Sequence, residues 1–358
     1  MPTASLRERL TSIQPVQAVE GGRITIYGSD FPIQRPRLPE VRVGDIPARV
    51  VCASSTAIAL LVPAGLEGGP TPIRIEGRPG ETIFIEVGSV LATGLHQVDN
   101  PVFDHEGNLY VTYSGSRGQE VAVSIFRVAA SGMREPFVTG IVNPTSMTFD
   151  RTGTLYVSSR FDGSVYRVSP DGKSEVFASE LGVACGLAFD HEGALFVGDR
   201  SGTIFRVTPD GRARPFATLP PSVAAFHLAM SSDDVLYVTA PTLGPYDHVY
   251  RIDRSGAISR VYSGFGRPQG LAFDPSGQLH VVEALAGNSG LFQLRSDGTV
   301  EQVVAASALV GVAFDPDATV VASNETVYRL RRGYDGVGGI DRANMAGLER
   351  HGNSSPGT

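Results

Sequence analysis

Hydrophobic and polar positions follow a phrase that returns about six times along the chain. It reads small residue, apolar residue, Phe and Asp, then a Gly turn, then Leu-aromatic-Val, as in Leu187-Ala188-Phe189-Asp190 followed by Leu195-Phe196-Val197. The Asp, or Ser231 in its place, falls at residues 104, 150, 190, 231, 274 and 315, so the steps are 46, 40, 41, 43 and 41 residues. A period of this length built from strand-turn-strand units predicts a β-propeller.

Each phrase continues into a second hairpin. Residues 165–168 alternate apolar and polar positions, turn at Asp171-Gly172, and resume at residues 175–178. Asp-Gly is a hairpin turn signal, because both residues tolerate the positive φ that tight turns require. The unit therefore has four strands, and the fold class is all-β with a six-bladed propeller.

The last unit lacks its fourth strand. It ends after three strands near Leu330, whereas a strand-like run over residues 83–92 precedes the first unit. We expect this run to complete the last blade and remove an open sheet edge, so the propeller spans residues 83–331.

The segment at residues 12–87 is a separate domain. Its short alternating strands are separated by Gly, Pro and Ser, which predicts a small antiparallel sandwich. It resembles an IPT/TIG immunoglobulin-like domain through three stretches, residues 21–31, 41–44 and 62–65. The resemblance implies a spacer or interaction module. Residues 1–11 are expected to be a flexible N-terminus, and residues 332–358, rich in Gly, to be a disordered tail.

Composition and charge narrow the function classes. The 358 residues include 42% apolar residues, enough for two cores, and the net charge of −7 comes without a basic block. This argues against nucleic acid and anionic membrane surfaces as partners. No apolar run of about 18 residues exists, so no membrane span is expected. The first ten residues lack an apolar signal core, which makes the cytoplasm the default location and leaves an exported form open. Oligomeric state cannot be read from the sequence.

The two cysteines carry little signal. Cys52 and Cys185 fall in different predicted domains. We therefore expect no disulfide, and we interpret both as small buried hydrophobic residues.

The propeller repeats resemble a known group. The chain has no Trp, which removes the WD-repeat class, and residues 268–277 and 165–172 resemble NHL-repeat and gluconolactonase-like (senescence-marker/luciferin-regenerating) six-bladed propellers. The resemblance covers residues 88–331. It implies a hydrolase of lactones or esters that holds a divalent cation at the channel mouth.

The family's metal positions are altered in this chain. By position, Asp99 takes the place of a Glu, Phe226 the place of an Asn, and Gln269 the place of an Asp. One carboxylate, one amide and one phenyl suit a hard cation poorly, so Asp99 is the only metal candidate. His227, Asp199 and Glu283 are the alternative set, and they would favour a transition metal.

Other polar residues are expected around the channel because they stand in the segments that enter first strands or in the turns between second and third strands. Candidate catalytic residues are His227, Glu283 and His248, the last within the longest loop between second and third strands. Candidate ligand-binding residues are Asn100, Asn143, Arg160, Asp199, Arg200, Asp247, Arg267 and Gln269.

Three functions remain open. The missing metal ligands favour a non-catalytic propeller that binds a small molecule, sugar or peptide on its channel face. A gluconolactonase-like hydrolase with a degenerate or altered metal site is the alternative. A purely structural interaction module is the third.

Overall fold

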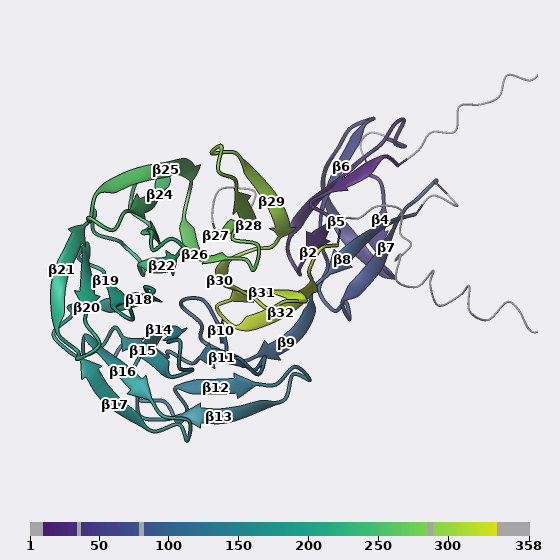
Figure 1. Cartoon of the computed structure of the whole chain (residues 1–358). Helices are drawn as coiled ribbons and strands as arrows, with labels where there is room; N and C mark the ends of the chain where they lie inside the picture. The colour runs from purple at the N-terminus through teal and green to yellow at the C-terminus, as the bar shows by residue number, and fades with distance from the viewer. Residues whose placement is uncertain (1–9, 34–36, 79–81, 285–288, 335–358) are drawn as a thin grey trace, which may run out of the picture.

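The computed structural model describes residues 10–33, 37–78, 82–284 and 289–334 (Figure 1). These residues form β-strands and connecting turns, and they contain no helix long and apolar enough to cross a membrane. The first nine residues and residues 335–358, which make up most of the two predicted flexible ends, lie outside the described part.

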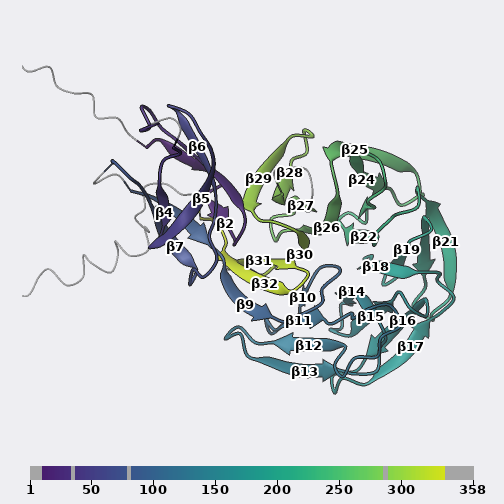
Figure 2. The ribbon, with the colours of Figure 1, turned by 180° about the vertical axis from the view of Figure 1, so that it is seen from behind.

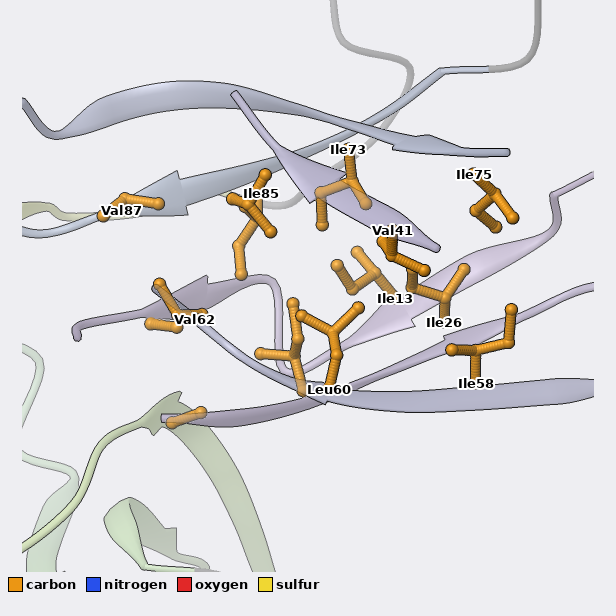
Figure 3. Close-up of a cluster of buried hydrophobic side chains, with 14 of the residues drawn as sticks. Ile13, Ile26, Val41, Ile58, Leu60, Val62, Ile73, Ile75, Ile85 and Val87 are labelled. Atoms are coloured by element: carbon orange, nitrogen blue, oxygen red, sulfur yellow. The ribbon is translucent and has the colours of Figure 1, made fainter. Parts of the chain in front are cut away.

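The N-terminal strands form the predicted sandwich. Hydrogen bonds run in the order β1-β3-β6-β5-β4-β7-β8, and the inward positions of each strand alternate with exposed ones, as in β3 with its buried Ile24 and Ile26. Branched apolar side chains from both sides meet in the core (Figure 3), among them the fully buried Ile58, Leu60 and Ile73. The strands are β1 (Ser12–Gln14), β3 (Arg23–Tyr27), β4 (Val41–Val43), β5 (Ile46–Ala53), β6 (Ala57–Leu61), β7 (Gly69–Ile75) and β8 (Ile83–Val87).

The rest of the described chain is arranged as a propeller of four-stranded antiparallel units (Figures 1 and 2). The first four units are β10 (Val102–Phe103), β11 (Leu109–Thr112), β12 (Ile125–Val128) and β13 (Arg134–Val138); β14 (Pro144–Phe149), β15 (Leu155–Ser159), β16 (Ser164–Val168) and β17 (Ser174–Ala178); β18 (Ala184–Phe189), β19 (Leu195–Asp199), β20 (Thr203–Val207) and β21 (Ala213–Thr218); β22 (His227–Met230), β23 (Leu236–Thr239), β24 (Asp247–Ile252) and β25 (Ile258–Phe265). The remaining strands are β26 (Pro268–Phe273), β27 (Leu279–Glu283), β28 (Gly290–Leu294) and β29 (Val300–Ala305), then β30 (Leu309–Phe314), β31 (Ala318–Ser323), β32 (Thr326–Arg331) and β9 (Ser89–Thr93).

The repeated phrase has a physical basis in each unit. The Asp closes the turn after the first strand: Asp150 Oδ1 accepts the backbone N–H of Thr152 at 2.8 Å and of Thr154 at 2.9 Å. The aromatic residue packs between neighbours, with the Tyr156 ring edge-on to Phe177 and Phe189 at 5.0 and 4.9 Å between centroids. Turn closure and edge-to-face packing therefore select these residue types in successive units.

Neighbouring units are joined by hydrogen bonds from their second strands. Ser158 Oγ donates to the carbonyl of Cys185 at 2.5 Å, and Thr239 Oγ1 donates to the carbonyl of Gln269 at 2.5 Å. All of these side chains except Gln269, which is 9% exposed, are almost fully buried. A buried hydroxyl with a fixed partner sets the angle between units as well as satisfying a polar group.

Only the second half of the run at residues 83–92 completes the last propeller unit as predicted. The strand β9 pairs antiparallel with β32, so the sheet β30-β31-β32 gains its fourth strand from the start of the propeller. The other half of the run, β8, belongs instead to the sandwich, where it pairs with β7 and β2.

The number of separate sheets differs from the predicted six blades. Among the described residues, five sheets have four strands each, while β26–β29 belong to a 12-stranded sheet that also contains the sandwich strands. The cause is β2 (Gln17–Ala18), which pairs in parallel with β29 on one side and with β8 on the other. A two-residue strand therefore fuses this unit of the propeller to the sandwich.

The junction between the domains is tightly packed. The backbone N–H of Val19 donates to the carbonyl of Ala305 at 2.9 Å, and a Cβ added to Gly22 would lie 2.2 Å from the same oxygen. Gln17 reaches across with its amide, which donates to the carbonyl of Arg331 at 2.6 Å. Backbone pairing and close approach both hold the sandwich against this part of the propeller.

Candidate functional site on the channel face

The channel face is the end of the propeller where first strands begin and second strands end. Antiparallel pairing brings these two chain positions together in each unit, as with Pro268 and Glu283 in β26 and β27. The candidate residues from the sequence lie in or next to these segments, except Asp247 and His248, which begin the third strand β24. Their individual contacts, however, separate them into different roles.

Three of the candidates meet in one buried hydrogen-bonded chain. His227 Nδ1 lies 2.6 Å from Asp99 Oδ1, and His227 Nε2 lies 3.2 Å from Gln269 Oε1. The exposed fractions of His227, Asp99 and Gln269 are 0%, 2% and 9%. We call these three residues the channel lock, because they join β22, β26 and the segment before β10.

The channel lock fixes the orientation of the His227 ring and gives each ring nitrogen a partner. Asp99 is a carboxylate acceptor, so His227 Nδ1–H donates to it, while Nε2 faces the carboxamide of Gln269. Asp99 Oδ1 also accepts the backbone N–H of Asn100 at 2.7 Å. A ring held at both nitrogens and shielded from solvent supports packing and orientation more readily than proton transfer to a substrate.

Asn100 extends the same connection. Its Nδ2 donates to the carbonyl of Leu271 at 2.8 Å, and its Oδ1 accepts the backbone N–H of Val312 at 2.9 Å. The backbone comes close on both sides, since a Cβ added to Gly270 would lie 2.1 Å from Asn100 Oδ1 and one added to Gly311 would lie 2.7 Å from Asn100 Cα. Asn100 therefore ties the first strands of two units to the segment before β10.

The other carboxylates accept hydrogen bonds from their own loops. Asp199 Oδ1 accepts the backbone N–H of Val183 at 2.7 Å, and both Glu283 oxygens accept the N–H of Arg267, at 3.0 and 3.2 Å. Asp247 accepts the N–H of Thr242 at 3.0 Å and its hydroxyl at 2.6 Å. Buried carboxylates that accept backbone N–H groups order the loops that cross the face.

Two further candidates also serve the loops. Asn143, with φ of 47°, donates through Nδ2 to the carbonyls of Ser114 and Ser116 and accepts the N–H of Gly118. His248 is separate from the channel lock: its Nδ1 lies 2.8 Å from Ser263 Oγ on β25, and burial, then the charge of Arg260, lowers its pKa. The structure does not bring His248 together with His227.

Arg160 and Arg200 on this face donate to backbone carbonyls and form no ion pair with a carboxylate of the described residues. Arg160 donates to the carbonyl of Gly115 at 3.3 Å, and Arg200 donates to the carbonyls of Ser222 and Val223 at 3.2 and 2.8 Å. Burial lowers the pKa of Arg160, and the positive charges of Arg200 and Arg117 lower it further. Within the described residues, none of these three arginines pairs with a carboxylate. They form a positively charged group that we call the arginine cluster.

Asp99, Phe226 and Gln269, which correspond to the metal ligands of gluconolactonase-like propellers, do not fit a divalent cation. Phe226 is fully buried in an apolar cluster, Asp99 Oδ1 accepts two N–H groups, and the Gln269 oxygen faces His227. The part of the chain that the structure describes contains no group of three His, Cys, Asp or Glu side chains able to hold a metal ion. Hard cations require several charged oxygens that are free to coordinate, which this donor set does not supply.

The two cysteines occupy opposite environments. Cys185, beside the channel lock, is buried, and burial raises its pKa to about 12. Cys52 is exposed on β5, which corrects the expectation that both thiols are buried; its Sγ lies 3.9 Å from Arg23 Nη2.

Thiol labelling can test this difference. At mildly alkaline pH we expect a disulfide reagent to modify Cys52 rapidly in the folded protein and Cys185 only after unfolding, because the thiolate is the reactive form. Mass spectrometry of the labelled peptides measures both rates. Equal rates in the folded protein would contradict the buried position of Cys185.

The hydrogen bonds that join these residues could not be predicted from the sequence. Asp99 and His227 are separate candidates there, and Arg117 and Cys185 are not candidate site residues. Asp99 and His227 are 128 residues apart, so no local pattern links them. The repeat register carried a usable signal, since Arg160 and Arg200 each follow the end of a second strand in adjacent units.

Comparison with known proteins agrees with the two-part architecture. Residues 9–87 match the IPT/TIG domain. No curated protein matches the chain. Three solved structures share the fold at low identity. A gluconolactonase from Xanthomonas campestris has 16% identity and a TM-score of 0.59, over 83% of this chain and 98% of that one. An auxiliary nutrient binding protein from Bacteroides thetaiotaomicron has 12% identity and a TM-score of 0.55, over 90% of this chain and 97% of that one. A virginiamycin B lyase from Staphylococcus aureus has 15% identity and a TM-score of 0.50, over 68% of this chain and 97% of that one.

Proposed function

We propose that this chain is a binding protein whose channel face takes an anionic small molecule, with the IPT/TIG domain as a spacer or interaction module. The observation that carries the proposal is the contrast between the two kinds of charged side chain on this face. Asp199, Asp247 and Glu283 accept backbone hydrogen bonds, whereas the arginine cluster forms no ion pair within the described residues. Guanidinium groups without carboxylate partners are suited to bind carboxylate or phosphate.

The architecture supports the same proposal. Proteins named as nutrient binding and as gluconolactonase both share this fold, so the fold alone is compatible with binding and with hydrolysis. We further propose that β26–β29 act as the sixth blade, because they repeat the antiparallel order of the other units and differ only in their link through β2. The channel face then belongs to a closed six-bladed ring.

The alternative is a gluconolactonase-like hydrolase. The observation that favours it is the short contact between His227 and Asp99, an arrangement that can orient a general base. Burial opposes it, since His227 is fully buried and both of its nitrogens face side chains of the protein. We therefore expect no hydrolysis of glucono-lactone above the rate in buffer.

Binding of simple anions tests the proposed function. Calorimetry with gluconate, citrate and inorganic phosphate should detect binding of at least one anion, weaker at higher salt because the contacts are electrostatic. The Arg160→Gln/Arg200→Gln double variant should lose about tenfold or more in affinity.

Arg254→Gln/Arg295→Gln is the matched control, because it removes two exposed arginines from other parts of the propeller. Absence of binding by all three anions, or equal affinity in the channel-face variant and the native protein, would reject the proposal. Hydrolysis of glucono-lactone that disappears in His227→Gln would favour the alternative.

A further inference from the structure

A polar cleft lies between the sandwich and the propeller, away from the channel face. Its volume is about 910 Å³, and its walls come from β1 and β3 of the sandwich and from β27–β31 of the propeller. Both views of the ribbon place the sandwich beside β29, on the side where β2 joins the two domains (Figures 1 and 2). Small-molecule sites typically have volumes of roughly 300–1,000 Å³, so the cleft has suitable dimensions.

The strand positions that form the propeller wall of this cleft can be compared with the corresponding positions in the other propeller units. Cross-strand neighbours form a row of aromatic residue, Arg and a third residue, as in Tyr156, Arg167 and Glu175. In that row Arg167 forms an ion pair with Glu175. The middle position is also Arg127, Arg206, Arg251 and Arg329 in other units.

The unit that faces the sandwich departs from this row. His280 replaces the aromatic residue and Gln293 replaces the Arg, while Glu301 takes the third position, which is also Glu in two of the other units. All three line the cleft. An imidazole and a carboxamide therefore stand where four other units have a tyrosine or phenylalanine and a guanidinium, and Glu301 pairs instead with the exposed Arg295.

His280 presents an unused acceptor. It is 6% exposed, its ring lies 4.8 Å from that of Phe314, and its Nδ1 lies 3.1 Å from the carbonyl of Gln278. Burial lowers its pKa, which favours the neutral ring, and the carbonyl beside Nδ1 selects the tautomer in which Nδ1–H donates. Nε2 is then an acceptor without a partner in the described part of the chain, on a residue that lines the cleft.

Polar side chains from both domains are unused in the same cleft. The amide of Gln293 and the hydroxyls of Thr25 and Tyr27 form no side-chain hydrogen bond with described residues, and neither do Gln14 and Thr319. The charged Arg332 and Asp274 lie together, with Nη2 and Oδ2 3.4 Å apart. Apart from this pair and from Arg23 and Glu301, the polar lining consists of uncharged donors and acceptors, and Tyr27 is 38% exposed.

We propose that this interdomain cleft binds a neutral oligosaccharide. Amides and hydroxyls can donate to and accept from adjacent sugar hydroxyls, and the imidazole Nε2 and a carboxylate can accept from them, because each sugar hydroxyl both donates and accepts. The wall contains two carboxylates, Glu301 and Asp274, and two guanidinium groups, Arg23 and Arg332, so it carries no excess positive charge for an anionic ligand. A largely apolar ligand would leave the polar groups unpaired. The β2 junction holds the two walls together before a ligand arrives, which lowers the entropic cost of binding.

Calorimetry with maltohexaose, cellohexaose, xylohexaose and mannohexaose tests the proposal on the full chain. We expect at least one of these neutral sugars to bind. The variant His280→Tyr/Gln293→Arg rebuilds the row found in other units, so it should fold, pair with Glu301 and lower the affinity by about tenfold or more. If thermal melting shows that this variant does not fold, Gln293→Ala replaces it, with loss of binding again expected.

Matched controls separate the cleft from the channel face. Arg167→Gln makes the reverse change at the corresponding row position of another unit and should leave sugar affinity unchanged, as should Arg160→Gln/Arg200→Gln. Failure of all four sugars to bind would overturn the proposal. So would binding that the cleft variants leave intact, or binding that the channel-face variant removes. Anion binding at the arginine cluster is measured separately, so either proposal can fail alone.

Discussion

Replacing His227 with Ala is expected to lower the free energy of unfolding of the propeller by about 3–5 kcal/mol, because it leaves the buried carboxyl group of Asp99 without its imidazole partner. Asp99 would remain 2% exposed without the imidazole that lies 2.6 Å from it, and a cavity would open beside Gln269. Urea unfolding, followed by a signal from the propeller, measures the change.

His248→Ala is the control for this prediction. His248 lies in β24 of the same unit but is partly exposed, and its partner is a serine hydroxyl rather than a buried carboxylate. We expect a loss within about 0.5 kcal/mol, as for most surface substitutions. Similar losses in the two variants would show that the buried pair between His227 and Asp99 does not stabilise the fold.

Replacing Gly270 with Ala is expected to destabilise the propeller by about 1–3 kcal/mol or more, because the added methyl group has no space. Its Cβ would lie 2.1 Å from Asn100 Oδ1 and 2.8 Å from both Gly311 Cα and the carbonyl of Val310. The Asn100 oxygen cannot easily move, since it accepts the N–H of Val312. Thermal and urea unfolding measure the loss.

A double-mutant cycle identifies the cause of this loss. In an Asn100→Ala background the closest of these contacts is absent, so Gly270→Ala should cost less than it does in the native protein. Equal costs in both backgrounds would mean that Asn100 does not occupy the space beside Gly270. The two substitutions would then act independently.

The repeating elements could be predicted from local sequence. Asp150 closes its turn and Tyr156 packs against its neighbours within one unit, so each unit carries its own signal. The alternating residues of the sandwich strands likewise report a buried and an exposed face, as in β3.

The junction between the domains could not be predicted in the same way. The strand β2 has two residues and pairs in parallel with segments far along the chain, and so short a stretch has no periodicity. Its pairing explains why the described residues form five separate four-stranded sheets and one fused sheet.

The candidate site could be predicted by position and not by role. The repeat register placed Asp199 and Glu283 at the ends of their strands, but their hydrogen bonds to the N–H groups of Val183 and Arg267 depend on loop geometry. The contact between His227 and Asp99 depends on ring closure across 128 residues. The altered row at His280 and Gln293 was present in the sequence, yet only the strand register shows that the two residues are neighbours.

The central claim is our proposal that Asp99 and Gln269, at positions that correspond to metal ligands of gluconolactonase-like propellers, form a structural lock with His227, and that the channel face works by binding and not by metal-assisted hydrolysis. Elemental analysis after exhaustive dialysis against buffers containing calcium, zinc, magnesium or manganese tests it most directly, with a thermal-shift titration of the same ions. We predict that no cation is retained in stoichiometric amount and that none raises the melting temperature specifically. A stoichiometric cation that stabilises the native protein, and is lost in Asp99→Asn and His227→Ala, would contradict the claim.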